Sequence, residues 1–282
     1  MNPKNNQGDE SLSSNSPTDE KTLLDVLADR LTPVMPPETQ RQSLRNRLLE
    51  RVADSAARHE GLITRRRGEG GWRKVKAGVA MKLLWSSEEG NSVLLRLDPG
   101  ASLPEHRHRF VEEAVVLSGD LQMGQEVLGT GDYHVSPPGS RHRKSVSHEG
   151  CLAYVRGTSL GDERTVALEV ISGLLPYQGP ASATAAADGG EWSEIAPGVA
   201  HRILRSADGV LSRLVRMAPG SQVEAHAHER DEECMMLEGD AFLGDILLQA
   251  GDYQVAPAGT WHGLLHSDHG ALLFVRGAAP CA

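Results

Sequence analysis

The feature that most constrains this chain is an internal repeat. Residues 71–157 and 191–277 align without a gap at a constant offset of 120 residues. Both copies consist of short aliphatic and β-branched runs, such as SVLLRL and EEAVVL, interrupted by glycine and proline, and no long helical pattern follows Gly71. Two copies of one β unit are therefore expected. The matching residues include Trp72 with Trp192, Gly131-Asp132-Tyr133 with Gly251-Asp252-Tyr253, and Val155-Arg156-Gly157 with Val275-Arg276-Gly277.

Three further segments lie outside the two repeats. We expect residues 1–16 to be disordered, because they are polar and lack apolar periodicity. Residues 17–58 are expected to be helical, since Ser16 and Pro17 suit a helix start and leucines follow at helical spacing. The sequence TPVMPP interrupts this pattern, so two short helices are predicted, the second starting near Glu38. The Ala/Ser/Gly-rich residues 178–190 are predicted to form a flexible or extended linker between the repeats.

Each of the two predicted helices carries an apolar stripe. A short amphipathic helix cannot bury such a stripe by itself. The stripes must therefore pack against the β units, a second subunit or a partner protein. They consist of Leu23, Leu24, Leu27 and Leu31 in the first helix, and of Leu44, Leu48, Leu49, Val52 and Ala56 in the second.

Composition excludes several classes of protein. A formal net charge of −9 argues against direct binding of nucleic acid, because such proteins usually present a basic surface. The three cysteines, Cys151, Cys234 and Cys281, are far apart and form no CxxC pair, which is typical of a reducing compartment. The amino-terminal residues do not resemble a secretory signal, and no apolar run is long enough to span a membrane. We therefore expect a cytoplasmic protein.

Each repeat contains the same spaced set of potential metal ligands. Two histidines at positions i and i+2 of a strand point to one side, and a glutamate four residues later points the same way. The next residue, Glu113 or Glu233, should face the opposite side. A third histidine follows about 30 residues later, after a Pro-x-Gly turn. The predicted metal ligands are His106, His108, Glu112 and His142 in the first repeat, and His226, His228, Glu232 and His262 in the second.

Three imidazoles and one carboxylate suit several divalent ions, one in each repeat. Zinc and iron are the first expectations, and manganese or nickel is also compatible with these ligands. Zinc prefers four ligands, so this set would complete its coordination in a structural or sensing site. Iron, manganese or nickel prefers about six, which would leave two positions open for a small molecule.

The pattern G(x)5HxH(x)3–4E(x)6G, followed by G(x)5PxG(x)2H, resembles the two-part cupin signature, and both repeats fit it. The resemblance implies an all-β fold of two tandem cupin jelly-roll (double-stranded β-helix) barrels, preceded by a short α-helical amino-terminal segment. It also implies that the four named residues of each repeat are the metal ligands. The segments LLRLDPGASLPEHRH, EEAVVLSG and SPPGSRH further resemble the cupin domain of ChrR-type anti-sigma factors.

This resemblance implies a regulatory protein in transcription control that acts as an anti-sigma factor or senses a ligand or an oxidant. Residues 17–58 resemble the end of an anti-sigma domain, so a sigma factor is the expected partner of the helices. ChrR-type proteins carry an HxxxCxxC zinc motif in that domain, whereas no cysteine precedes Cys151 here. The alternative is a metal-dependent cupin dioxygenase that acts on a small oxygenated or diketone-like substrate. Either function would place a small molecule in the barrels, and the barrels could pair within one chain or between two chains.

A few other residues have both a functional and a structural interpretation. Cys234 could be a redox-sensitive thiol near the second site, although a small buried apolar residue is the simpler interpretation. His266 could face inward but is expected at the surface. The basic run 65–67 is expected to be a solvated linker, and Trp72 and Trp192 are expected to pack on the barrels.

Overall fold

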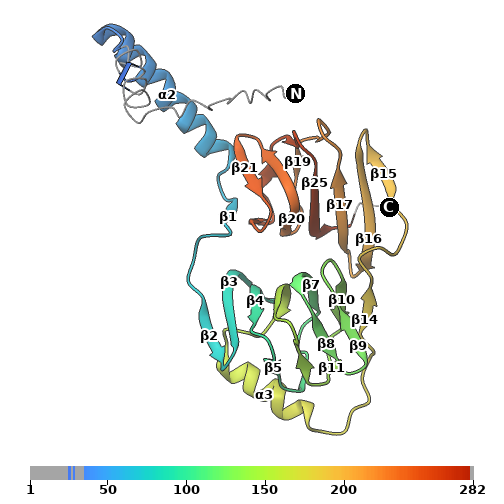
Figure 1. Cartoon of the computed structure of the whole chain (residues 1–282). Coiled ribbons are helices and arrows are strands. Elements are labelled where there is room, and N and C mark those ends of the chain that lie inside the picture. Colours follow the sequence, from blue (N-terminus) through green and yellow to red (C-terminus); the bar gives the residue numbers. More distant parts are fainter. Residues whose placement is uncertain (1–24, 27, 29–34, 280–282) are drawn as a thin grey trace, which may run out of the picture. The chain divides into compact units, whose positions relative to one another are not determined.

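The structure is a computed structural model that describes residues 25, 26, 28 and 35–279. The chain divides into two compact units, Met1–Asp54 and Ser55–Ala282. Both repeats lie in the second unit and fold into jelly-roll barrels (Figure 1). Among the described residues, no helix is both long enough and apolar enough to cross a membrane.

The first barrel is built from the first repeat and one strand of the segment that follows it. Its strands are β2 (Arg73–Lys76), β3 (Val79–Ser87), β4 (Gly90–Leu97), β5 (Ser102–Leu103), β6 (His106–Arg107), β7 (Glu112–Gly119), β8 (Leu121–Met123), β9 (Glu126–Leu128), β10 (Tyr133–Ser136), β11 (Arg141–His142), β12 (Ser145–Val146), β13 (Cys151–Thr158) and β14 (Ala183–Ala185). The larger sheet has the order β14-β10-β7-β13-β4-β3-β2. Strands β5-β12-β8-β9 and the pair β11-β6 form the remainder.

The second barrel repeats this arrangement. Its strands are β1 (Ile63–Arg65), β15 (Ser193–Ala196), β16 (Val199–Ala207), β17 (Val210–Met217), β18 (Gln222–Val223), β19 (His226–Ala227), β20 (Glu232–Leu243), β21 (Ile246–Gln249), β22 (Tyr253–Ala256), β23 (Trp261–His262), β24 (Leu265–His266) and β25 (Ala271–Ala278). The main sheet has the order β1-β22-β20-β25-β17-β16-β15. The strand β20 also pairs with β21 and β24, and β19 pairs with β23.

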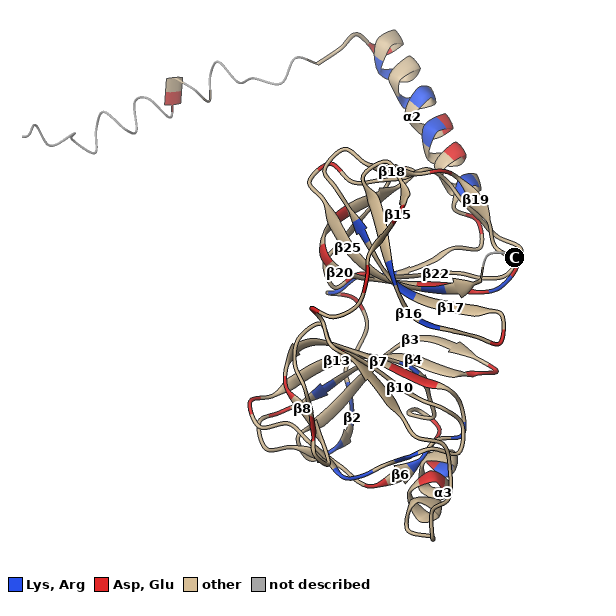
Figure 2. Cartoon of the chain, turned by 90° about the vertical axis from the view of Figure 1, so that its right-hand side faces the viewer, with Lys and Arg blue, Asp and Glu red and all other residues tan. Residues whose placement is uncertain are grey.

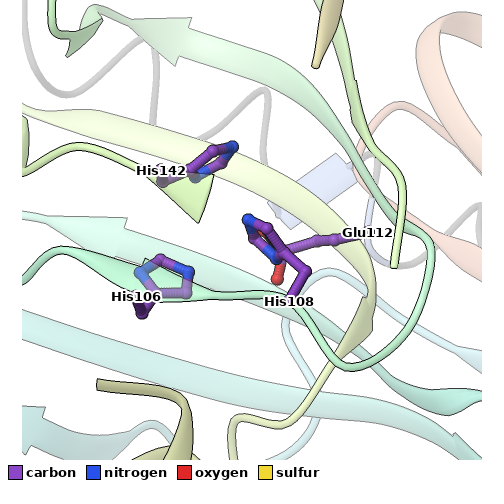
Figure 3. A group of neighbouring side chains, drawn as sticks. All are labelled: His106, His108, Glu112 and His142. Atoms are coloured by element: carbon purple, nitrogen blue, oxygen red, sulfur yellow. Dashed lines mark ion pairs between the residues drawn. The ribbon is translucent and has the colours of Figure 1, made fainter. Parts of the chain in front are cut away.

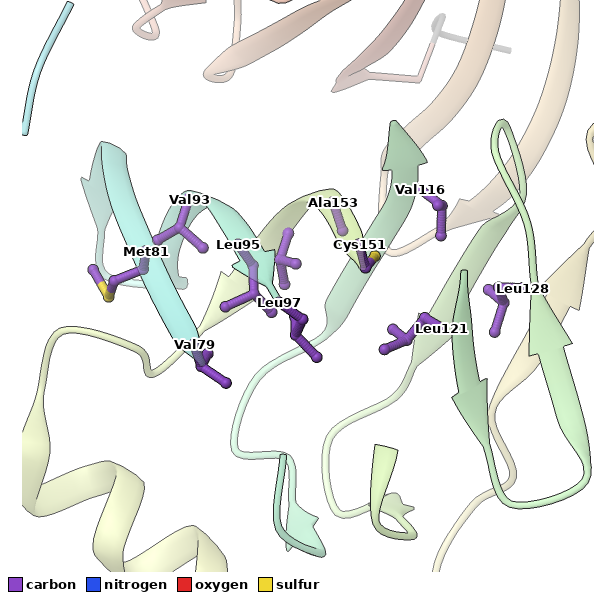
Figure 4. Close-up of a cluster of buried hydrophobic side chains, with 11 residues drawn as sticks. Val79, Met81, Val93, Leu95, Leu97, Val116, Leu121, Leu128, Cys151 and Ala153 are labelled. Atoms are coloured by element: carbon purple, nitrogen blue, oxygen red, sulfur yellow. The ribbon is translucent and has the colours of Figure 1, made fainter. Parts of the chain in front are cut away.

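The sheets are buried on both faces, which explains their continuous apolar runs. Alternate residues of β4, Val93, Leu95 and Leu97, point into the first barrel, where they join the cluster drawn in Figure 4. Leu94 belongs instead to a cluster formed by both barrels, together with Tyr154 and residues of the second repeat. Because successive side chains of a strand alternate between faces, one sheet contributes both to its own interior and to the contact between the barrels.

The segment before each repeat supplies a strand to the other barrel. Strand β1 precedes the first repeat and pairs antiparallel with β22 of the second barrel. Strand β14 precedes the second repeat and pairs antiparallel with β10 of the first barrel. Thr64 of β1 and Thr184 of β14 are separated by the repeat offset of 120, so the exchange is reciprocal. The predicted linker 178–190 thus contains an ordered strand.

The aspartates of the two Gly-Asp-Tyr triplets anchor these exchanged strands. The Asp252 carboxylate accepts a 2.7 Å hydrogen bond from the Arg67 backbone amide, and its other oxygen accepts one from the Arg66 side chain at 2.9 Å. Asp132 accepts the equivalent bond from the Ala187 amide at 2.7 Å. The basic run 65–67 is therefore an ordered part of the fold and not a linker, although Arg65 and Arg67 are exposed to solvent as expected.

A reciprocal set of buried polar contacts joins the two barrels. Glu113 of β7 accepts hydrogen bonds from Tyr133 of its own barrel at 2.6 Å and from Ser212 and Arg276 of the other barrel. Glu233 of β20 occupies the matching place. It accepts bonds from Tyr253 of its own barrel and, across the interface, from Ser92, Tyr154 and Arg156.

Both carboxylates are almost completely buried, with Glu113 0% and Glu233 1% exposed. Burial opposes ionisation of Glu233, but the charge of Arg156 and the hydroxyl donors outweigh it and hold the pKa of this carboxyl below its usual value. A buried charge is tolerated only where such partners surround it. The two glutamates thus fix the way in which the barrels meet.

The helix α2 (Glu38–Arg58) starts where the sequence predicts the second helix. Its apolar residues Leu44, Leu48, Leu49 and Val52 are all exposed, and charged residues are spread along its length (Figure 2). The first predicted helix, with Leu23 to Leu31, lies largely outside the described residues, as do residues 1–16.

One helix contradicts the expectation that no helix follows Gly71. The helix α3 (Glu163–Gly173) lies between the repeats, and Asp162 caps it by accepting hydrogen bonds from the Arg164 and Thr165 amides. Its β-branched residues weaken the helical signal. Gly173 lies so close to β6 that an added Cβ would be 2.8 Å from the His106 Cα, so tertiary packing stabilises this helix more than its own propensity does.

The buried contacts of Glu233 yield a stability prediction. Substitution Glu233→Ala leaves the Arg156 guanidinium and two tyrosine hydroxyls without their shared acceptor, so the free energy of unfolding should fall by about 3–5 kcal/mol. The control is Glu238→Ala, which removes an exposed carboxylate from the same strand. Urea denaturation measures both, and equal midpoints for the two variants would contradict the role assigned to Glu233.

Candidate metal centres

The first candidate centre is formed where β6 and β11 pair. His106 and His142 are direct partners in this antiparallel pair. His108 lies just after β6, held by a backbone hydrogen bond from its amide to the Ser140 carbonyl at 2.9 Å and by one from the Gly139 amide to its own carbonyl at 2.8 Å. Glu112 is the first residue of β7. Figure 3 shows the four side chains converging from these separate strands.

The second barrel reproduces this geometry. His226 and His262 are partners in the pair β19-β23, His228 is held by hydrogen bonds with Thr260 and Gly259, and Glu232 begins β20. The ring centroids of His228 and His262 are 4.3 Å apart, compared with 4.4 Å for His108 and His142. In each barrel, the four residues offer donor atoms that all lie within 4.8 Å of one another. The structure therefore brings together all eight sequence-predicted residues, as two groups of four.

Hydrogen bonds orient one imidazole of each centre. The His106 Nδ1 atom lies 3.0 Å from the Pro104 carbonyl oxygen, and the His226 Nδ1 atom lies 2.9 Å from the Glu224 carbonyl oxygen. A carbonyl can only accept, so Nδ1 carries a proton, and Nε2 is the atom available to a metal once it is unprotonated. A fixed tautomer of this kind prepares a histidine to ligate a metal through Nε2.

Burial keeps the other imidazoles in the neutral form that a metal requires. It lowers the pKa of His108 to about 3, reinforced by the neighbouring His106 and His134, and it lowers the pKa of His262 to about 4. Burial also raises the pKa of Glu112. At Glu232 burial acts in the same direction, but the neighbouring His226 side chain and the other imidazoles outweigh it and hold the pKa of this carboxyl below its usual value. The same interaction with Glu232 raises the pKa of His226.

The residues present fit a divalent transition ion. The Nε2 atoms of His108, His228 and His262 are buried and lack a hydrogen-bond partner among the described residues. Buried polar atoms normally have a partner, and a cation held by nitrogen and carboxylate donors would supply one. Both centres thus contain donors that the protein itself leaves unsatisfied.

A fifth histidine at the first centre was missed from the sequence. His134 of β10 is buried, and its Nε2 atom lies 3.0 Å from the His142 Nε2 atom. Its Nδ1 atom lies 2.8 Å from the Thr184 hydroxyl of the exchanged strand β14. The second repeat has Gln254 at this position, and Gln254 donates to Thr64 at 3.0 Å. The sequence could have pointed to His134 because it is the one position at which the two Gly-Asp-Tyr-x-Val segments differ.

The remaining residues singled out from the sequence have structural roles. Cys234 lies in the apolar interior of the second barrel, where burial raises the pKa of its thiol. The His266 ring stacks on Phe242 with a centroid distance of 4.9 Å. Trp72 and Trp192 each lie beneath an arginine, Arg96 and Arg216.

Two matches to one family model cover most of the chain. The model describes a ChrR cupin-like domain, and it matches residues 63–160 and 181–279. The chain belongs to the ChrR cupin-like family. Its matched segments begin near β1 and β14, so they include the exchanged strands as well as the repeats. A comparison with curated proteins returned no match.

Solved structures with the same double-cupin fold include two enzyme-like neighbours. One is a protein from Nostoc punctiforme provisionally described as a dioxygenase, with 16% identity, a TM-score of 0.59, and coverage of 76% of this chain and 81% of that one. The other is a variant of the oxalate decarboxylase OxdC from Bacillus subtilis, with 20% identity, a TM-score of 0.55 and 78% coverage of both chains. Identities this low establish the fold alone.

Removing one ligand should empty one centre. We expect the purified chain to carry about two divalent ions, one per four-residue group. The variant His142→Ala should carry about one ion, and the double variant His142→Ala, His262→Ala almost none. Elemental analysis after purification without added metal measures this. His148→Ala, which changes an exposed histidine of the same barrel, is the control, and unchanged metal content in His142→Ala would refute the assignment.

Proposed function

We propose that this chain is a metal-dependent double-cupin regulatory protein. Each barrel holds one divalent ion, the barrels respond to a small ligand or an oxidant, and the amino-terminal segment transmits that response to a partner. The observation that carries the proposal is the grouping of three histidines and one glutamate inside each of two barrels. Membership of the ChrR cupin-like family supports the regulatory interpretation.

The eight predicted residues would hold the ions. His106, His108, Glu112 and His142 would bind one, and the equivalent residues of the second barrel the other. Zinc or iron fits this donor set best, with manganese and nickel also compatible. A bound divalent ion supplies a Lewis-acidic centre, whose charge a single carboxylate only partly neutralises. The neutral imidazoles and the fixed His106 and His226 tautomers prepare both centres for it.

The helix α2 is the proposed contact for a partner. Its exposed leucines, Leu44, Leu48 and Leu49, together with Val52, form an apolar face flanked by arginines. An exposed apolar helix face of this kind is suited to a groove on another protein. We propose that the partner is a sigma factor, bound without the zinc motif of ChrR-type proteins, and that this occurs in the cytoplasm.

A second candidate function is a metal-dependent cupin dioxygenase. A cavity beside the first centre favours it, since this cavity borders His106, Glu112 and His142 and could admit a small oxygenated or diketone-like substrate. The two functions differ in whether the ion must react with oxygen. Iron loading followed by measurement of oxygen uptake separates them, because only a dioxygenase would consume oxygen when such a substrate is added.

The proposed partner contact leads to a binding experiment. The affinity-tagged full chain should retain a sigma factor, identified by mass spectrometry, under reducing or oxidising conditions. Leu48→Asp should abolish retention, because it places a charge in the centre of the apolar face of α2. Gln42→Asp adds the same charge elsewhere on the helix and should retain the partner. No sigma factor bound to the wild-type chain in either redox state would contradict the regulatory role.

A further inference from the structure

The interior of the first barrel is partly hollow. A cavity of about 260 Å³ lies between its sheets, and three residues of the first candidate centre, His106, Glu112 and His142, form part of its wall. Most of the remaining wall is aliphatic, with Leu95, Leu97, Val116, Ala153 and Val155 among its residues. Several of these side chains belong to the cluster in Figure 4.

The helix α3 closes one side of this cavity. Val166, Glu169 and Val170 of α3 contribute to the wall. Glu169 is held by a hydrogen bond from the Ser159 hydroxyl at 2.6 Å. Gly173 at the end of the helix packs directly against His106. The cavity is thus bounded by the first metal centre, by the sheets and by a helix that the sequence did not predict.

The second barrel distributes its side chains differently beneath its metal centre. Strand pairing places Val116 opposite Ala153 in the first barrel. The residues at the corresponding positions of the second barrel are the larger Met236 and Leu273. Cys234 likewise replaces Ala114. All three larger side chains lie in the packed interior of the second barrel.

The far end of the second barrel shows the opposite change. Ala241 and Ala271 stand there in place of Leu121 and Cys151. The substitutions at the two ends of the barrel therefore act in opposite directions. In the first barrel, the small side chains lie in the layers next to the metal ligands, so the open space adjoins the metal centre.

We propose that the first barrel binds a medium-chain aliphatic carboxylate, with its chain in the cavity and its carboxylate at the first metal centre. An engineered cavity of about 150 Å³ holds the six carbons of benzene, so a cavity of this volume holds roughly ten non-hydrogen atoms. The aliphatic wall selects an apolar chain. A divalent ion held by one carboxylate retains a positive charge, which selects an anionic head. The ligand class depends on the proposed metal-binding function.

Isothermal titration calorimetry of the metal-loaded full chain with octanoate tests the proposal. Octanoate should bind at one site per chain, and acetate, which lacks the chain, should bind at least about tenfold more weakly. Ala153→Leu should reduce octanoate affinity by at least about tenfold, because it fills the space beneath the first centre with the residue found at this position in the second barrel. Leu273→Ala, the matched change in the second barrel, should leave this affinity unchanged.

Metal content and circular dichroism of the variants show whether Ala153→Leu has kept its fold and its ions. Octanoate that binds no better than acetate, or that binds Ala153→Leu as it binds the wild type, would overturn the proposal. These outcomes are separate from failure of the proposed function, which would appear as a wild-type chain that holds no ion. A metal-free chain that still binds octanoate, and that loses this binding in the variant Ala153→Leu, would support an apolar ligand site. It would exclude the metal-bound head.

Discussion

The alternation of side chains along β7 and β20 is the constraint on which the rest of the structure depends. Glu112 points into its barrel toward three imidazoles, and Glu113, the next residue, points to the opposite face and accepts hydrogen bonds from the second barrel. Glu232 likewise points into the second barrel toward its imidazoles, and Glu233 accepts hydrogen bonds from the first barrel. One Glu-Glu pair per repeat therefore serves both the candidate metal centre and the joining of the barrels. A shift of one residue in either strand would exchange the two roles and disrupt both sites.

The exchanged strands extend this coupling to the chain on either side of the repeats. Thr184 of β14 contacts His134 of the first barrel, so the segment leading to the second barrel reaches the surroundings of the first candidate centre. The equivalent contact, between Thr64 and Gln254, lacks the imidazole. The packing beneath the two candidate centres differs as well, so the barrels are chemically distinct although their candidate ligands match.

Much of the candidate site could be predicted because the repeat shows each pattern twice. The spacing His-x-His-x-x-x-Glu specifies a strand face, and its recurrence in register indicates eight candidate ligands, which the structure groups in fours. The exchanged strands were less visible, because three-residue strands such as Ile63–Arg65 carry little periodicity. The helix α3 depends on packing against His106, which no local pattern contains. His134 stood in the sequence without a matching histidine in the second repeat, so its position near His142 could be learned only from the fold.

If three histidines and one glutamate of each barrel hold a single ion, that ion should be visible between them. Crystallography with anomalous data collected at the absorption edge of the bound metal provides the test. Two anomalous peaks per chain are expected, each with nitrogen and oxygen donors from its four residues at about 2.0–2.2 Å, the distances for zinc. Peaks confined to surface residues, or empty barrels in protein that retains metal, would contradict it.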